Sequence, residues 1–170
     1  LVVDAGQDTL ANLFPPGSVP NYTTVYKLTP GGYTINTYYT DLPGWDPNPN
    51  ETFDLGGGAF IYNPAAAFDI TWVGEVAQGT LVNTVGAGFT MQSSQVPQTT
   101  NLTTIGVQPG NYDTVYTHDP VAGYSIYTYY TDLPGWDPGD AAGPTIPLGS
   151  AFFYLNNSGS GAISRDFTIE

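Results

Sequence analysis

An eleven-residue stretch of the chain, Thr37–Pro47, recurs without a single change as Thr128–Pro138. A repeat this close indicates that the chain contains two copies of one structural unit. Similar segments flank both copies, and insertions in the loops between them make the offset grow along the chain. The aligned flanking segments are Asn21–Tyr26 with Asn111–Tyr116, Ala59–Tyr62 with Ala151–Tyr154, and Asp69–Thr71 with Asp166–Thr168.

The pattern of apolar residues predicts β-strands rather than helices. Glycine (21 residues) and proline (15 residues) interrupt every stretch, and only Ala65–Ala67 suggests a helical turn. Runs with a period of two favour strands. The expected hairpins are Thr23–Leu28 with Tyr33–Tyr39 and Asp113–His118 with Tyr124–Tyr130. The other expected strands are Thr80–Val82, Phe89–Met91, a central apolar strand at Ala59–Tyr62 and at Ala151–Leu155, and a final strand burying Ile70 and Trp72 in one copy and Phe167 and Ile169 in the other.

These strands predict an all-β chain of two tandem antiparallel β-sandwich modules, Ig-like or jelly-roll-like, arising from the internal repeat. The expected boundaries are 1–76 and 77–170. The two copies differ at their start, because two expected strands precede the second copy and only Leu1–Val3 precedes the first. The first module is therefore expected to be short of a strand, which leaves an apolar sheet edge to be covered.

Composition excludes several classes of partner. Fifteen acidic residues stand against Lys27 and Arg165, so the net charge is −13. Binding to nucleic acid needs clustered basic residues, and an anionic membrane surface would repel this chain. There is no cysteine, hence neither a disulfide nor a thiolate metal site. No apolar run is long enough for membrane insertion. A chain rich in Thr, Tyr and Gly with few lysines is expected to be extracellular or on the cell surface, as a mature form whose signal peptide has been removed.

The residues that could carry catalysis are few, and the repeat argues against them. His118 is the only histidine, and its repeat equivalent is Leu28. Lys27 similarly aligns with Thr117. A position that accepts leucine or threonine in the sister copy is a packing or surface position. No Gly-x-Ser-x-Gly nucleophile motif occurs. The chain is therefore not expected to be an enzyme or to need a cofactor.

Five aspartates fall in or near the duplicated loops: Asp41, Asp46, Asp132, Asp137 and Asp140. Aspartate before Leu-Pro or Pro commonly initiates a turn by accepting a backbone hydrogen bond, and this is the favoured interpretation. Calcium ligation and a carboxylate pair for glycoside hydrolysis are the alternatives. The Asp-x-Asp-x-Asp-Gly spacing of a calcium loop is missing, so no metal site is expected.

Aromatic residues gather in the same loops. Trp45, Trp136 and the pairs Tyr38–Tyr39 and Tyr129–Tyr130 could stack against sugar rings, as in a carbohydrate-binding module. The other interpretation is that one tyrosine of each pair faces the core while the tryptophan clamps the loop. The second interpretation is favoured because small β-domains are rich in aromatic residues without a ligand.

Asn-x-Ser/Thr motifs, which can accept N-linked glycan in exported proteins, also occur. All of them fall in expected loops, and the chain is a candidate glycoprotein. The motifs begin at Asn21, Asn50, Asn101 and Asn156.

The Leu-Pro-Gly-Trp-Asp-Pro loops and the Gly-x-Ala-Phe-Phe-type strands resemble those of exported bacterial β-domains of uncharacterised function. At the level of architecture, tandem sandwiches with a missing strand and an apolar terminal segment are similar to pilin-like fibre subunits, which pass a terminal strand into a neighbour's open sheet. This chain differs from the best-known pilins in lacking a disulfide and a long donor arm before Asp4.

We therefore expect a structural subunit of an extracellular fibre, filament or surface layer, a homopolymer assembled head-to-tail by strand donation. The alternative is a carbohydrate-binding or adhesive module that uses Trp45 and Trp136. A glycosidase with Asp132 and Asp137 in one cleft ranks third. The residues expected in the donated strand are Leu1, Val2, Val3, Phe167 and Ile169.

Overall fold

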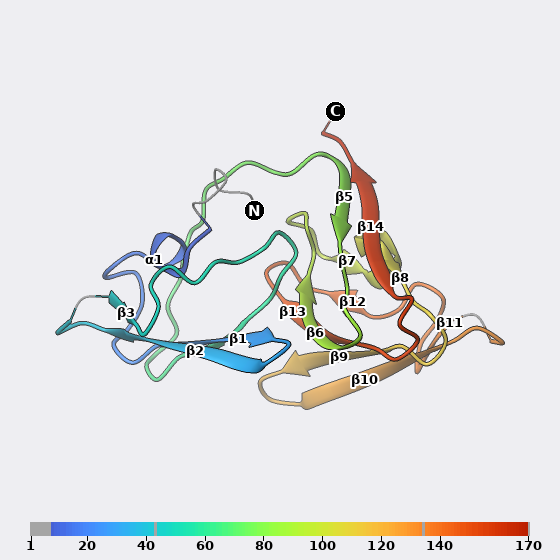
Figure 1. Cartoon of the computed structure of the whole chain (residues 1–170), viewed down its shortest axis with the longest axis horizontal. Coiled ribbons are helices and arrows are strands. Elements are labelled where there is room, and N and C mark those ends of the chain that lie inside the picture. The colour runs from blue at the N-terminus through green and yellow to red at the C-terminus, as the bar shows by residue number, and fades with distance from the viewer. Residues whose placement is uncertain (1–7, 43, 134, 170) are drawn as a thin grey trace. The chain divides into compact units, whose positions relative to one another are not determined.

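The computed structural model describes residues 8–42, 44–133 and 135–169 (Figure 1). The chain is all-β, as expected, and the strands pair in antiparallel fashion throughout these residues. Two helices of a single turn were not expected: α1 (Leu10–Leu13) and α2 (Leu102–Ile105). A single turn carries too little periodicity to be recognised in a sequence.

The chain divides into two compact units, which are described separately. The first unit comprises Leu1–Leu55 and Ala59–Val76, and the second comprises Gly56–Gly58 and Ala77–Glu170. The short excursion of the chain at Gly56–Gly58 into the second unit was not predicted.

The first unit contains a four-stranded sheet in the order β3-β2-β1-β4. Its strands are β1 (Thr24–Thr29), β2 (Gly32–Tyr39), β3 (Gly44–Asp46) and β4 (Phe60–Tyr62). The expected first hairpin is confirmed, because the whole of β1 pairs with residues 32–37 of β2 around the glycine turn. Helix α1 contributes Leu10 to the core of this unit. The buried apolar side chains of the core are Leu10, Phe14, Val19, Val25, Tyr38 and Trp45.

Strand β4 lies at the edge of this sheet, not at its centre. Among the described residues, it pairs with β1 and with no other strand. The prediction of a central strand is therefore wrong for this copy, since a continuous apolar run does not reveal how many neighbours a strand has. Two of its three side chains are well exposed, Ile61 at 44% and Tyr62 at 57%.

The second unit contains a five-stranded sheet in the order β11-β10-β9-β13-β6. The second hairpin and the central apolar strand are both confirmed, because β9 pairs with β10 and β13 lies between β9 and β6. The bounds are β6 (Gly88–Ser93), β9 (Thr114–Asp119), β10 (Gly123–Tyr130), β11 (Gly135–Asp137) and β13 (Ala151–Asn156).

Two smaller sheets complete the second unit. One has the order β5-β14-β8, and the other pairs β12 with β7. The expected strand Thr80–Val82 is confirmed as part of β5. The bounds are β5 (Gly79–Asn83), β7 (Thr100–Asn101), β8 (Val107–Gln108), β12 (Thr145–Ile146) and β14 (Ala162–Phe167).

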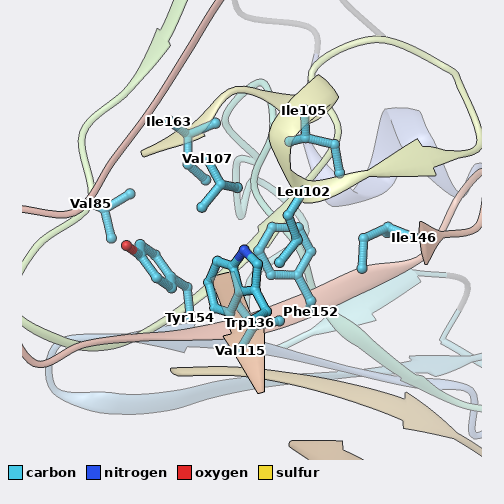
Figure 2. Packing of buried hydrophobic residues seen from close by; sticks show 10 residues of the cluster. All are labelled: Val85, Leu102, Ile105, Val107, Val115, Trp136, Ile146, Phe152, Tyr154 and Ile163. Atoms are coloured by element: carbon cyan, nitrogen blue, oxygen red, sulfur yellow. The ribbon is translucent and has the colours of Figure 1, made fainter. Parts of the chain in front are cut away.

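The core of the second unit draws side chains from all three of these sheets and from helix α2. Figure 2 shows them converging on one cluster, with the indole of Trp136 among them. Phe152 and Tyr154 alternate along β13 with half-buried residues, as expected for a strand with one face in the core. The ten residues are Val85, Leu102, Ile105, Val107, Val115, Trp136, Ile146, Phe152, Tyr154 and Ile163.

Strand pairing corrects the alignment of the two apolar strands by one residue. Tyr26 lies opposite Phe60, whereas the equivalent Tyr116 lies opposite Phe153. Phe60 therefore corresponds to Phe153 and not to Phe152. A slip of one residue exchanges the two faces of a strand, so it changes which side chains are assigned to the core.

The expected final strand is present only in the second unit. Residues 63–76 contain no strand, although Ile70 still packs against the core of the first unit. Trp72 is 44% exposed, and its indole N–H donates to the Leu13 carbonyl oxygen at 2.8 Å. In β14 the fully buried side chain is Ile163, whereas Phe167 is half-buried and Ile169 lies beyond the strand.

The segment Gly56–Gly58 packs along β6. The Ser93 N–H donates to the Gly56 carbonyl oxygen at 2.7 Å, and its hydroxyl donates to the Gly57 carbonyl oxygen at 2.9 Å. A Cβ atom at Gly58 would lie 2.6 Å from the Ala151 Cβ and 2.9 Å from the Met91 Cγ. Glycine is required there because no larger residue leaves room for the backbone to approach.

Candidate functional site

Both loop tryptophans are buried. Trp45 on β3 is 4% exposed and Trp136 on β11 is 3% exposed. The Trp45 indole N–H donates to the Phe14 carbonyl oxygen at 3.1 Å, and its ring packs against Tyr38 with 5.5 Å between centroids. Neither tryptophan exposes a ring face to solvent, so neither Trp45 nor Trp136 is available in this structure to stack against a sugar ring. Both rings instead anchor the duplicated loops in the cores.

The loop aspartates are exposed. The hydrogen bonds of Asp140 show it acting as a turn residue. The Asp140 carboxylate accepts from the backbone N–H groups of Ala142 and Gly143, at 2.8 and 3.2 Å. In the β9–β10 turn, the N–H groups of Ala122 and Val121 bind the Asp119 carboxylate and lower its pKa. Within residues 8–42, 44–133 and 135–169, no group of three or more His, Asp or Glu side chains could hold a metal ion.

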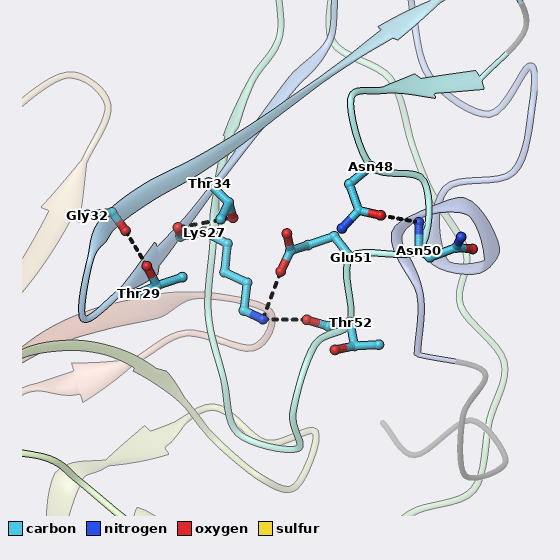
Figure 3. A network of polar contacts seen from close by, with 8 residues as sticks. All are labelled: Lys27, Thr29, Gly32, Thr34, Asn48, Asn50, Glu51 and Thr52. Atoms are coloured by element: carbon cyan, nitrogen blue, oxygen red, sulfur yellow. Dashed lines mark hydrogen bonds and ion pairs between the residues drawn. The ribbon is translucent and has the colours of Figure 1, made fainter.

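The two basic side chains are already engaged. The Lys27 ammonium forms an ion pair with Glu51 at 3.1 Å and donates to the Thr52 carbonyl oxygen at 2.6 Å (Figure 3). Arg165 donates from one guanidinium nitrogen to the side-chain oxygen of Gln98 at 3.2 Å, whereas its Nε and Nη1 atoms are buried without a hydrogen-bond partner among the described residues, and burial lowers its pKa. His118 is exposed on β9, where its ring contacts Tyr124 with 4.9 Å between centroids. Lys27 therefore fastens the loop that carries Glu51.

The four glycosylation motifs lie in different surroundings. Asn50 is exposed, and Asn21 is half-buried with its side-chain oxygen bound to the Thr40 N–H at 3.0 Å. Asn101 caps helix α2 by accepting from the Thr104 N–H at 2.9 Å. Asn156 is 3% exposed, and its amide nitrogen donates to the Val85 carbonyl oxygen. The expectation of a loop is wrong for Asn101, which is the last residue of β7, and for Asn156, because β13 buries the nitrogen that would carry the glycan.

The residues expected in the donated strand differ in where they lie and in what they pair with. Leu1, Val2 and Val3 lie outside the described residues. Phe167 lies in β14 opposite Gly79 of β5, so it already has a pairing partner in its own chain. Ile169 is 59% exposed, and its N–H donates to the Gln78 side chain at 3.1 Å.

Asp113 organises a buried polar cluster in the second unit. Its carboxylate is fully buried and accepts from the Tyr154 hydroxyl at 2.7 Å, the Gly110 N–H at 2.7 Å and the Ser158 N–H at 2.8 Å. Burial and the neighbouring Asp113 raise the pKa of Tyr154 above its ordinary value. Every acceptor is satisfied locally, so this cluster stabilises the fold and offers no free group for catalysis.

The most unusual local geometry belongs to two tyrosines that the sequence reasoning missed. Tyr22 and Tyr112 have φ angles of 66° and 64°, and each is 58% exposed. Tyr22 stacks edge-to-face on Tyr39, with centroids 5.7 Å apart, and Tyr112 stacks on Tyr130 at 5.6 Å. The only sequence signal is the duplicated Asn-Tyr dipeptide, because φ cannot be read from residue identity.

Backbone bonds hold both tyrosines in this conformation. The Tyr22 N–H donates to the Tyr38 carbonyl oxygen, and the Tyr112 N–H donates to the Tyr129 carbonyl oxygen, each at 2.8 Å. Asn21, which precedes Tyr22, accepts a hydrogen bond from the backbone N–H of Thr40, the residue after Tyr39. The equivalent bond is present in the second unit. Tyr39 also lines an open cavity of about 670 Å³ in the first unit, with Asp41, Asp46 and Pro49 among its other walls.

Comparison with protein-family models, curated proteins and solved structures gave no match to this chain. Neither helix of the described residues has the length and hydropathy needed to cross a membrane.

Proposed function

We propose that the chain is a structural subunit that assembles with copies of itself outside the cell, by strand addition to its first unit. In this proposal, both units are copies of one β-sandwich module, and the first copy lacks a strand that the second copy has. Strand β13 has β6 on its outer side, whereas no described strand occupies the corresponding side of β4. Addition of an extended segment to an open sheet edge is a common mode of protein recognition.

The exposure of Ile61 is the observation that carries the proposal. By strand pairing Ile61 corresponds to Tyr154, since Val25 lies opposite the first and Val115 opposite the second. Tyr154 is fully buried, but Ile61 is 44% exposed. A side chain on the core-facing side of its strand is thus left partly uncovered, which favours a missing neighbour.

The N-terminal segment Leu1–Val3 of a second copy is the proposed donor. Its three consecutive apolar residues suit pairing with an apolar edge strand. The C-terminal alternative is disfavoured because Asp166 and Phe167 already pair with Thr80 and Gly79 of β5. Donation from one copy to the next does not close on itself, so it would propagate as a filament.

The short acceptor strand predicts a weak and reversible polymer. A three-residue strand adds about three hydrogen bonds at roughly 1 kcal/mol each. Burying each donor side chain adds about 1.5–3 kcal/mol. Association costs on the order of 4–15 kcal/mol, so little remains. The net charge of −13 on every copy opposes contact further, and assembly should therefore strengthen as salt screens that repulsion.

Disulfide trapping tests the proposal in a chain that has no cysteine of its own. The double variant Val2→Cys, Ile61→Cys is oxidised at high protein concentration and run on a non-reducing gel. A ladder of covalent oligomers is expected, because each copy would carry one donor and one acceptor thiol. A variant with Val2→Cys alone can form nothing larger than a dimer.

The matched control pairs Val2→Cys with Val82→Cys, an exposed position on β5 of the second unit. This control should give little beyond dimers. An equal ladder from both double variants would show that trapping is unspecific and would refute the proposal. A monomer closed by an internal disulfide would refute it as well, because Leu1–Val3 would then complete its own chain.

A further inference from the structure

Two tyrosine pairs, each with one exposed and one half-buried ring, are the feature of the fold that assembly does not explain. Tyr22 with Tyr39 and Tyr112 with Tyr130 have the same geometry in both units, with ring planes at 88° and 87°. Glycine adopts a φ near +65° without steric cost, whereas tyrosine does not. The loop conformation alone would therefore favour glycine at positions 22 and 112. Backbone geometry therefore does not explain why these positions carry tyrosine, whose ring lies on the surface in both units.

The surroundings of the first pair combine apolar and acidic groups. Tyr39 lines the open cavity of about 670 Å³ whose walls include the apolar Leu42 and Pro49. Asp41 and Asp46 line the same cavity. Carboxylates only accept hydrogen bonds, so they select ligands rich in donors such as hydroxyl groups. The duplicated loop places Asp132 and Asp137 at the same positions of the second copy.

Charge narrows the class of ligand further. Lys27 is bonded to Glu51, and the Arg165 guanidinium lies over the Phe167 ring of β14, so neither basic side chain belongs to the tyrosine pairs. At a net charge of −13 the chain repels polyanions such as uronic acid polymers or sulfated glycans. A neutral sugar has C–H groups that contact the electron-rich face of a tyrosine ring and hydroxyl groups that donate to carboxylates.

We propose that the Tyr22–Tyr39 and Tyr112–Tyr130 pairs are two binding sites for a neutral polysaccharide. Each exposed tyrosine stacks on a sugar ring, and the loop aspartates accept hydrogen bonds from its hydroxyl groups. The edge-to-face contact with Tyr39 or Tyr130 restrains each exposed ring before binding, so little conformational freedom is lost when the sugar arrives. The repeat supplies an equivalent pair in each unit, so each unit is expected to bind the polysaccharide by itself.

Native affinity electrophoresis tests this inference directly. The full chain is run in gels containing hydroxyethylcellulose, glucomannan, galactomannan or xylan, with polygalacturonate as the anionic comparison. At least one neutral polymer should retard the chain, and polygalacturonate should not. The double variant Tyr22→Gly, Tyr112→Gly should lose retardation, and either single variant should keep part of it because the site in the other unit remains.

The control is Tyr124→Gly, which removes a tyrosine that is 54% exposed on β10 and belongs to neither pair. It should be retarded like the unmodified chain. The inference is overturned if no neutral polymer retards the chain, if polygalacturonate retards it equally, or if the double variant binds unchanged. It is also overturned if the double variant only alters the oligomeric mass, because the rings would then contact another copy. Disulfide trapping through Val2 and Ile61 involves none of these tyrosines, so the two proposals can fail separately.

Discussion

The positive φ angles of Tyr22 and Tyr112 predict that glycine variants at these positions are more stable than alanine variants, which is the reverse of the usual order. Alanine normally stabilises an exposed position relative to glycine, because glycine has more conformational freedom in the unfolded chain. At a φ near +65°, any residue with a Cβ atom is disfavoured by about 1–2 kcal/mol. The entropy difference offsets about 0.4–1 kcal/mol of that penalty. Tyr22→Gly should therefore be more stable than Tyr22→Ala, by roughly 0.5–1 kcal/mol, and position 112 should behave alike.

Comparing glycine with alanine isolates the backbone term, because both variants lose the same ring contact with Tyr39 or Tyr130. The assay is urea unfolding followed by circular dichroism, with glycine and alanine variants of one position compared on the same transition and at equal m-values. Position 124 in strand β10 is the control, where alanine should be the more stable by roughly 0.5–1 kcal/mol. Alanine variants at least as stable as the glycine variants at both 22 and 112 would refute the reasoning.

Three further predictions concern Tyr154, Phe152 and Ile61. Tyr154→Phe removes the donor at 2.7 Å from Asp113 and should lower the free energy of unfolding by about 1–3 kcal/mol, measured by urea unfolding; an unchanged midpoint would contradict this role. Because burial raises the pKa of Tyr154, the unfolded chain ionises first: the stability is fully present below a pH of about 10 and falls as pH rises further. The Phe variant should show a shallower fall in thermal midpoint above that pH, and an identical fall would show that Tyr154 does not titrate on unfolding. Phe152→Ala should cost about 3–5 kcal/mol in the 2% exposed site, whereas Ile61→Ala should cost less than about 2 kcal/mol at 44% exposure; equal losses would mean that Ile61 is packed in solution.

The hairpins could be predicted from the sequence because the residue pattern of their strands and the position of the turn both specify the same strand register. Alternating Thr, Tyr and Val residues on both sides of a turn that contains Pro and Gly leave one register that puts Val25 and Val115 in the core. The apolar strands were recognised too, but their neighbours were not. Phe60–Tyr62 and the central part of β13 are similar in composition, and only tertiary pairing makes one an edge and the other a centre.

The candidate site was harder to predict than the fold. Tryptophan was the expected ligand-facing residue because of its size, yet a large ring is also the most effective core anchor, and Trp45 and Trp136 are both buried. The exposed rings are instead Tyr22 and Tyr112, whose distinguishing property is a backbone angle. Residue propensities assign such an angle mainly to glycine, asparagine and aspartate and not to tyrosine, so the duplicated Asn-Tyr dipeptide could be noticed but not interpreted.

The glycine segment at 56–58 ties the two units together through the order of the chain. The polypeptide enters the second unit at Gly56, returns to the first at Ala59, and leaves it again after Val76. A protease cut after Val76 would therefore not yield two intact halves, because the C-terminal fragment would lose the strip that lies against Met91 and Ala151. A second unit produced from Ala77 onward would lack the same strip, so it should be less stable than the second unit of the full chain.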